Sequence, residues 1–176
     1  MTHQILSRET VFTAHAFEVE ALNVRLPDQR IRQYDLVNHR DSATILPIDQ
    51  DGDIWFVRQY RMGSESELLE LPAGVMDDQE TAMDCALREI REEIGMAAGD
   101  MQQIGSMYLV PGYSNELNHV FLARKLTPSP LDKDEDEFLS IQKIHIHEIR
   151  QLVEKSGLID GKSLAALFLA WPKLTE

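Results

Sequence analysis

The sequence predicts a mixed α and β protein. Strand-like apolar stretches recur along most of the chain, one central segment has clear helical periodicity, and two further helical segments close it. The 176 residues are enough for one compact domain with a substantial core. With 43% hydrophobic and 27% charged residues, the composition is that of an ordinary globular protein, which excludes wholesale disorder.

Two hairpins are predicted in the N-terminal half. Residues 19–40 alternate roughly between apolar and polar and break at Pro27, which predicts two strands joined by a turn. Residues 44–49 and 54–60 are apolar stretches on either side of Gly52, and we interpret them as a second hairpin.

The later elements follow from turn residues and apolar runs. Pro72 ends a short strand, and a loop at Pro111 separates two longer ones. The strands are expected over residues 67–71, 101–110, 118–126 and 138–145. Helices are expected near 147–155 and 162–171, and a mobile, acidic surface loop over 126–137.

The chain is strongly acidic. Its 30 acidic and 17 basic residues give a formal net charge of −13, which makes nucleic acid and anionic membranes poor partners. A small phosphate ligand remains compatible if metal ions bridge the two negative partners.

Cysteine content and hydropathy predict a soluble cytoplasmic protein. The single cysteine, Cys85, leaves no intrachain disulfide and no cysteine-rich zinc site. The chain begins without a secretory pattern, and its longest clean apolar run, 164–171, is far shorter than the roughly 20 residues of a membrane span.

Residues 81–94 form the clearest predicted helix, which Gly95 ends. On a helical wheel at about 100° per residue, four apolar side chains share a stripe that we expect to face the core. They are Met83, Leu87, Ile90 and Ile94. Three glutamates lie together on another side of the wheel: Glu89, Glu92 and Glu93.

These glutamates repel one another. Like charges at i,i+4 destabilise an isolated helix by roughly a few tenths of a kcal/mol, and acids late in a helix oppose its macrodipole. A shared divalent cation such as Mg²⁺, which prefers carboxylate and phosphate oxygens, would explain their clustering. Taken alone, the cluster fits a solvated acidic face equally well.

A wider spacing pattern favours the metal interpretation. Nine positions fit G-x5-E-x7-R-E-U-x-E-E-x-G-U, where U is a bulky apolar residue. They are Gly74, Glu80, Arg88, Glu89, Ile90, Glu92, Glu93, Gly95 and Met96. In this segment, residues 74–96, here called the box, the sequence resembles the Nudix hydrolases. The resemblance implies an α/β/α sandwich with a mixed β-sheet, and cleavage of a nucleoside diphosphate linked to another group.

The resemblance also implies roles for individual residues. Mg²⁺, or Mn²⁺ as a substitute, would be bound by Glu89, Glu92, Glu93 and the backbone carbonyl of Ala73. Arg88 would hold the glutamates through ion pairs. Arg88 and Glu92 would both be catalytic residues. Structural roles in the box fall to Gly74, Glu80 and Gly95.

Segments outside the box resemble the ADP-ribose pyrophosphatase branch of the family. They are residues 57–61, 69–74, 111–116 and 134–138. This resemblance implies cleavage of ADP-ribose to AMP and ribose 5-phosphate. GDP-mannose, NADH and diadenosine polyphosphates remain alternative substrates. A domain that binds an ADP-ribose-type ligand without cleaving it is a further alternative.

The branch also implies a general base and substrate contacts. A glutamate of the acidic loop would serve as base on closing over the substrate, with Glu135 preferred over Glu137. Candidate substrate-binding residues are Arg58, Arg61, Glu70 and Glu116.

The resemblance further implies two regions. Residues 1–42 are expected to form an N-terminal β region, including a hairpin, that makes a homodimer. Residues 43–176 are expected to form the Nudix hydrolase domain.

Residues 161–163 (Gly-Lys-Ser) are similar to the end of a phosphate-binding P-loop. The spacing from Gly157 is one residue too short for that motif. We expect instead that Asp160 or Ser163 caps the last helix.

Overall fold

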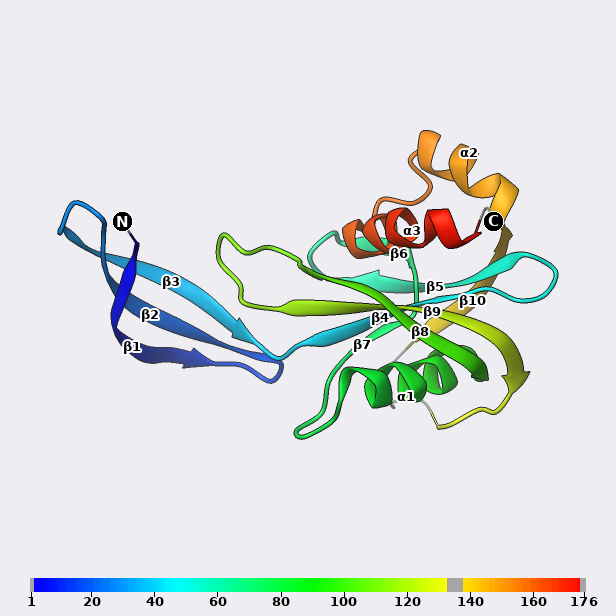
Figure 1. Ribbon diagram of the computed structural model, residues 1–176, viewed down its shortest axis with the longest axis horizontal. Coiled ribbons are helices and arrows are strands. Elements are labelled where there is room, and N and C mark those ends of the chain that lie inside the picture. The colour runs from blue at the N-terminus through cyan, green and yellow to red at the C-terminus, as the bar shows by residue number, and fades with distance from the viewer. Residues whose placement is uncertain (1, 133–137, 175–176) are drawn as a thin grey trace. The chain divides into compact units, whose positions relative to one another are not determined.

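The computed structural model describes residues 2–132 and 138–174, which form two compact units (Figure 1). One, the N-terminal unit, consists of the residues up to Asp41 together with Tyr108–Leu117. The other, the main unit, consists of Ser42–Met107 and the residues from Asn118 onward.

An antiparallel sheet in the order β1-β2-β3 forms the N-terminal unit. Its strands are β1 (Gln4–Thr13), β2 (Phe17–Arg25) and β3 (Ile31–His39). Strands β2 and β3 pair along their whole length, which confirms the first predicted hairpin. Strand β1 was not expected from the sequence, because its residues are exposed throughout and its apolar side chains come in adjacent pairs rather than alternating.

The segment Tyr108–Leu117 lies beside β3. The backbone N–H of Val37 donates to the carbonyl of Tyr113 (2.7 Å), and that of Asn115 donates to the carbonyl of Val37 (3.3 Å). This segment therefore belongs to the N-terminal unit, although strands of the main unit precede and follow it in the sequence.

Two sheets form the main unit. The first, in the order β7-β4-β9-β8, contains β7 (Ala73–Val75), β4 (Ser42–Pro47), β9 (Leu117–Pro128) and β8 (Met96–Tyr108). The second, in the order β10-β5-β6, contains β10 (Leu139–His145), β5 (Asp53–Arg61) and β6 (Ser66–Glu70). The predicted strands are all present, and β8 begins five residues earlier than expected.

The second predicted hairpin is wrong in its pairing. The turn at Gly52 exists, with φ of 85°, but a single bridge between Ile48 and Ile54 joins the flanking segments. Strand β4 instead pairs parallel with β9 and antiparallel with β7, whereas β5 pairs with β6 and β10. All six residues of β4 are buried, as expected for a central strand rather than one arm of a hairpin.

The first sheet of the main unit has a helix against each face (Figure 1). Alternate residues of β4 and β9 point to opposite sides. One set packs on α1 (Ala82–Ile94) and includes Ala43, Ile45, Phe121 and Ala123. The other packs with the second sheet and α3 (Gly161–Leu174) and includes Leu46, Val120 and Leu122.

Helix α1 begins and ends where the sequence predicts. Thr81 is the N-cap and accepts from the N–H of Asp84, and Gly95 ends the helix with φ of 69°. The predicted core stripe is only half correct, because Met83 and Leu87 are exposed. Compared with the predicted stripe, the buried face of the helix is shifted toward the side that carries the glutamates. It comprises Cys85, Ala86, Glu89, Ile90, Glu93 and Ile94.

The C-terminal helices also confirm the predictions. A 3₁₀ turn, η1 (Ile146–Glu148), leads into α2 (Ile149–Glu154), and α3 follows. Within the described ranges, no helix is long and apolar enough to cross a membrane.

Candidate active site

The box folds as a short strand, a loop and a helix, all within the main unit. Strand β7 carries Gly74, the loop carries Glu80, and α1 carries Arg88 and the three glutamates. Because β7 pairs with β4 and α1 packs on the same sheet, the strand and the helix lie side by side.

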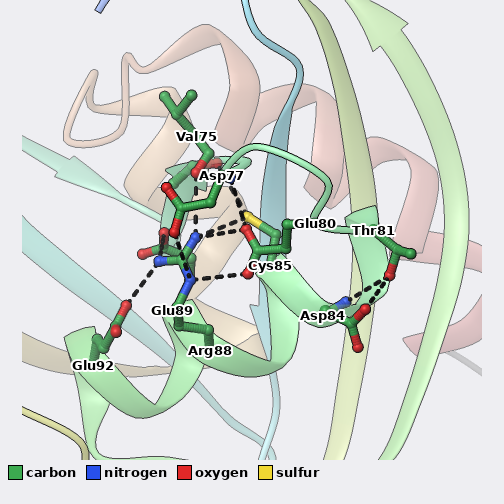
Figure 2. Close-up of polar contacts among 10 residues, drawn as sticks. Val75, Asp77, Glu80, Thr81, Asp84, Cys85, Arg88, Glu89 and Glu92 are labelled. Atoms are coloured by element: carbon green, nitrogen blue, oxygen red, sulfur yellow. Dashed lines mark hydrogen bonds and ion pairs between the residues drawn. The ribbon is translucent and has the colours of Figure 1, made fainter.

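Arg88 is the centre of a polar cluster (Figure 2). Its Nε and Nη2 donate to the carboxylate of Glu80 at 3.0 and 2.9 Å, while Nη1 donates to Glu89 at 2.5 Å and to Glu92 at 2.9 Å. Nη2 also donates to the carbonyl of Val75 at 3.2 Å. The hydrogen bonds with Glu80, together with attraction by Glu89, raise the pKa of Arg88.

Glu80 connects the loop to the helix. One of its oxygens accepts from the backbone N–H of Asp77 at 2.9 Å, and both accept from Arg88. Mainly because of the hydrogen bonds from Arg88, the pKa of Glu80 is lowered, so this carboxylate is charged at neutral pH.

Two box glutamates are buried. The residue exposures are 6% for Glu89 and 1% for Glu93, and an oxygen of Glu93 accepts from the backbone N–H of Ala73 at 3.2 Å. With Glu80 and Glu92, they give the box four glutamates, and three of these, Glu80, Glu89 and Glu92, bond to the guanidinium of Arg88. The cluster therefore carries excess negative charge, which favours a bound cation.

Gly74 makes room for Glu89. A Cβ on Gly74 would meet the carboxylate of Glu89 well inside the 3.0 Å that real Cβ contacts respect. A side chain at this position would displace Glu89, which gives a physical reason for glycine at the first box position.

Cys85 is buried among these residues. Burial, reinforced by the negative charge of Glu89, raises the pKa of its thiol to about 12. The thiol is therefore protonated at neutral pH and unsuited to act as a nucleophile.

Arg61 and Glu70 form a second polar group, on the neighbouring sheet. Arg61 donates from Nε and Nη2 to the two oxygens of Glu70 at 2.8 and 2.7 Å. The hydrogen bonds with Glu70 raise the pKa of Arg61, and the charge of Glu93 adds to this effect. Arg61 thus lies within electrostatic range of the box.

Two of the remaining predicted site residues, Arg58 and Glu116, have other partners. Arg58 donates to the side chain of Gln142 on β10 at 2.8 Å. Glu116 belongs to the N-terminal unit, where its carboxylate lies 3.8 Å from Nδ1 of His39. The candidate bases Glu135 and Glu137 lie outside the described residues.

The donor chemistry of the box fits Mg²⁺, but the carboxylates do not converge on one point. Across residues 2–132 and 138–174, no group of three or more His, Cys, Asp or Glu side chains is arranged to hold a metal ion. Glu89 and Glu92 point toward Arg88 instead. Because Mg²⁺ is commonly bound through one or two carboxylates with waters and substrate phosphates, the box supplies suitable oxygen donors.

Helix α3 also contributes to this region, which was not expected from the sequence. The ammonium of Lys162 donates to Glu70, and the hydroxyl of Ser163 accepts from the backbone N–H of Leu71 at 2.7 Å. The expected cap is confirmed for Asp160, whose carboxylate accepts from the N–H of Ser163 at 3.0 Å. No local pattern signals these contacts, because the partners are 92 residues apart.

Comparisons with known proteins agree with the fold and the site. Residues 38–167 match the NUDIX domain, and the chain therefore belongs to the Nudix family. An ADP-ribose pyrophosphatase of Bacillus subtilis (strain 168) is 29% identical over 169 residues, which cover 95% of this chain and 91% of the relative. ADP compounds hydrolase NudE of Escherichia coli (strain K12) is 29% identical over 167 residues, which cover 94% of this chain and 89% of the relative.

A solved structure extends this similarity to the fold. The crystal structure of an ADP compounds hydrolase matches with a TM-score of 0.89 at 28% identity, covering 99% of this chain and 95% of that chain. The protein is thus a Nudix pyrophosphohydrolase, similar to ADP-ribose pyrophosphatases and related hydrolases. The resemblance stated from the sequence is confirmed.

Substitution of Gly74 tests the packing of the box. In Gly74→Ala, the new methyl group displaces the carboxylate of Glu89, and we expect the hydrolytic rate to fall by about 10²-fold, as for a misplaced catalytic group. Calorimetry should show weaker Mn²⁺ binding as well.

The matched control is Gly63→Ala, because a Cβ on Gly63 meets nothing within 4 Å. We expect wild-type rates from this control. A Gly74→Ala enzyme with the wild-type rate and Mn²⁺ affinity would contradict the assignment.

Proposed function

We propose that this protein is a Mg²⁺-dependent enzyme that cleaves ADP-ribose to AMP and ribose 5-phosphate by attack of water on the diphosphate. The observation that carries the proposal is the charge-rich cluster of the box, in which three glutamates bond to Arg88 and two glutamates, Glu89 and Glu93, are buried. Preference for an ADP compound is supported by the two relatives, whose names refer to ADP-ribose and to ADP compounds.

The metal would be held by glutamates of the box. Glu89, Glu92, Glu93 and the carbonyl of Ala73 are the proposed ligands of Mg²⁺, with Mn²⁺ as a substitute. When bound, the metal would neutralise the diphosphate and lower the pKa of the attacking water. Arg88 holds Glu89 and Glu92 in place by the ion pairs described above.

Arg61 is the proposed contact for the substrate phosphates. Its guanidinium is anchored on Glu70, yet its side chain remains 42% exposed. A guanidinium with free donors suits phosphate oxygens, and anchoring reduces the entropy lost when the phosphate binds. Arg58 and Glu116 remain secondary candidates for substrate contacts, and Glu135 or Glu137 for the base.

Substitution of one box carboxylate tests the proposed chemistry. In Glu93→Gln, the amide oxygen can still accept from Ala73, so the fold should be kept, while the rate falls by at least about 10³-fold through loss of a metal ligand. The assay follows Mg²⁺-dependent products by chromatography from ADP-ribose, ADP-glucose, GDP-mannose, NADH and a diadenosine polyphosphate.

The control is Glu154→Gln, on the exposed face of α2. AMP and ribose 5-phosphate released fastest from ADP-ribose would support the proposal. Faster cleavage of GDP-mannose or NADH would overturn the substrate, and an unchanged rate in Glu93→Gln would overturn the metal site. Binding of ADP-ribose without turnover of any compound would favour a binding domain.

We also propose that the N-terminal sheet makes a homodimer. Several large apolar side chains on it are exposed, including Val11, Phe12, Ile31 and Tyr34. These side chains are distributed over both faces of the sheet. A small sheet gains stability when exposed apolar side chains are covered, and a second copy of the chain would supply that cover.

Sedimentation at micromolar concentration tests the dimer. We expect a dimer for the wild type and for Ser7→Asp, and a monomer for Phe12→Asp, which places a charge among the exposed apolar side chains. A monomeric wild type, or a Phe12→Asp variant that remains dimeric, would count against this proposal.

A further inference from the structure

Lys162 occupies an unfavourable position for a cation. It lies in the first turn of α3, where the helix dipole favours negative charge, and its side chain is only 14% exposed. Such a side chain requires compensation by nearby carboxylates. It lies 3.1 Å from the carboxylate of Asp160 and forms a hydrogen-bonded ion pair with Glu70.

Glu70 is shared between two cations. Its side chain is 1% exposed and lies between the guanidinium of Arg61 and the ammonium of Lys162. Burial alone would raise the pKa of Glu70, but the hydrogen bonds from Arg61 and the attraction of Lys162 outweigh it and lower the pKa. Glu70 is therefore a charged, fixed anchor rather than a solvent-facing carboxylate.

The same turn of α3 also holds the backbone that leads into the box. The hydroxyl of Ser163 accepts from the N–H of Leu71, and two residues later the N–H of Ala73 donates to Glu93. The segment between Glu70 and Ala73 is thus held by α3 on one side and by α1 on the other. Lys162 and Ser163 act on adjoining residues of this segment.

Arg61 has both an anchored and an exposed side. Its Nε and Nη2 are bonded to Glu70, whereas its side chain is 42% exposed and senses the charge of Glu93. If Arg61 were the sole partner of Glu70, that carboxylate would neutralise it. Lys162 shares Glu70, so that carboxylate is not paired with Arg61 alone; together with Asp160, the four charged groups are neutral overall.

We propose that Lys162 is a positioning residue for substrate binding, holding Glu70 so that Arg61 is fixed and remains available to the substrate diphosphate. This inference rests on the proposed function, since it takes ADP-ribose as the ligand and Arg61 as its contact. It assigns to the first turn of α3 a role in the site beyond capping the helix.

The predicted effect falls on binding more than on the chemical step. Lys162→Met should raise the KM for ADP-ribose by about 10-fold and change kcat by less than about 2-fold, because the lost interaction acts before the reaction. Lys162→Arg should restore most of the affinity, because a guanidinium can also donate to Glu70.

A double-mutant cycle separates positioning from a general structural effect. The dissociation constant of ADP-ribose is measured by calorimetry without divalent metal, for the wild type, Lys162→Met, Arg61→Met and the double variant. If Lys162 acts through Arg61, its substitution has little effect once Arg61 is absent. An equal fold-change in both backgrounds, or an unchanged dissociation constant in Lys162→Met, would overturn the inference.

Controls keep this test decisive. Lys143→Met removes a lysine ion pair with Asp49 elsewhere in the main unit and should leave KM unchanged. If Lys162→Met does not fold, Lys162→Gln takes its place in the cycle, since its amide can donate to Glu70 without a charge. If the wild type cleaves ADP-ribose normally but the effects of the two substitutions on the dissociation constant are additive, the role of Lys162 is refuted and the proposed function stands. A wild type that neither binds nor cleaves ADP-ribose would refute the proposed function and this inference together.

Discussion

The guanidinium of Arg88 organises the site through its contacts with three glutamates and one backbone carbonyl. Without it, Glu80, Glu89 and Glu92 would repel one another within a small volume. The contact with Glu80 also ties the loop to α1, and the contact with Val75 ties β7 to the same helix. One side chain thereby joins the strand, the loop and the helix of the box, and it leaves the cluster with the negative charge that a divalent cation requires.

The backbone that leads from β6 into the box is held by both α1 and α3. Glu93 of α1 bonds to Ala73, and Ser163 of α3 bonds to Leu71. Glu70 adds the ion pairs with Arg61 and Lys162. Since the hydrolysis of a diphosphate relies on positioning and charge rather than on a covalent nucleophile, a rigid approach to the site is consistent with the chemistry of the family. The protonated thiol of Cys85 agrees with a mechanism that uses water.

Local spacing predicted much of this site, and long-range contacts account for what it missed. Thr81 and Gly95 bound α1 as expected, because capping depends on neighbouring residues. The helical wheel placed Met83 and Leu87 in the core by their apolar character alone, whereas the structure buries Glu89 and Glu93. The parallel pairing of β4 with β9 joins Ser42 to Asn118, and a turn at Gly52 could not reveal it. The role of α3 depends on partners just as distant in sequence.

The response of stability to metal alone tests the central claim most directly, that the glutamates gathered by Arg88 form a cation site. The measurement is the thermal unfolding midpoint of the wild type, Glu89→Gln and Glu154→Gln at increasing MnCl₂, because a ligand that binds only the folded state raises the midpoint. We predict a rise for the wild type and Glu154→Gln, and little or none for Glu89→Gln. A wild type that does not respond, or a Glu89→Gln variant that rises as much as the wild type, would contradict the account.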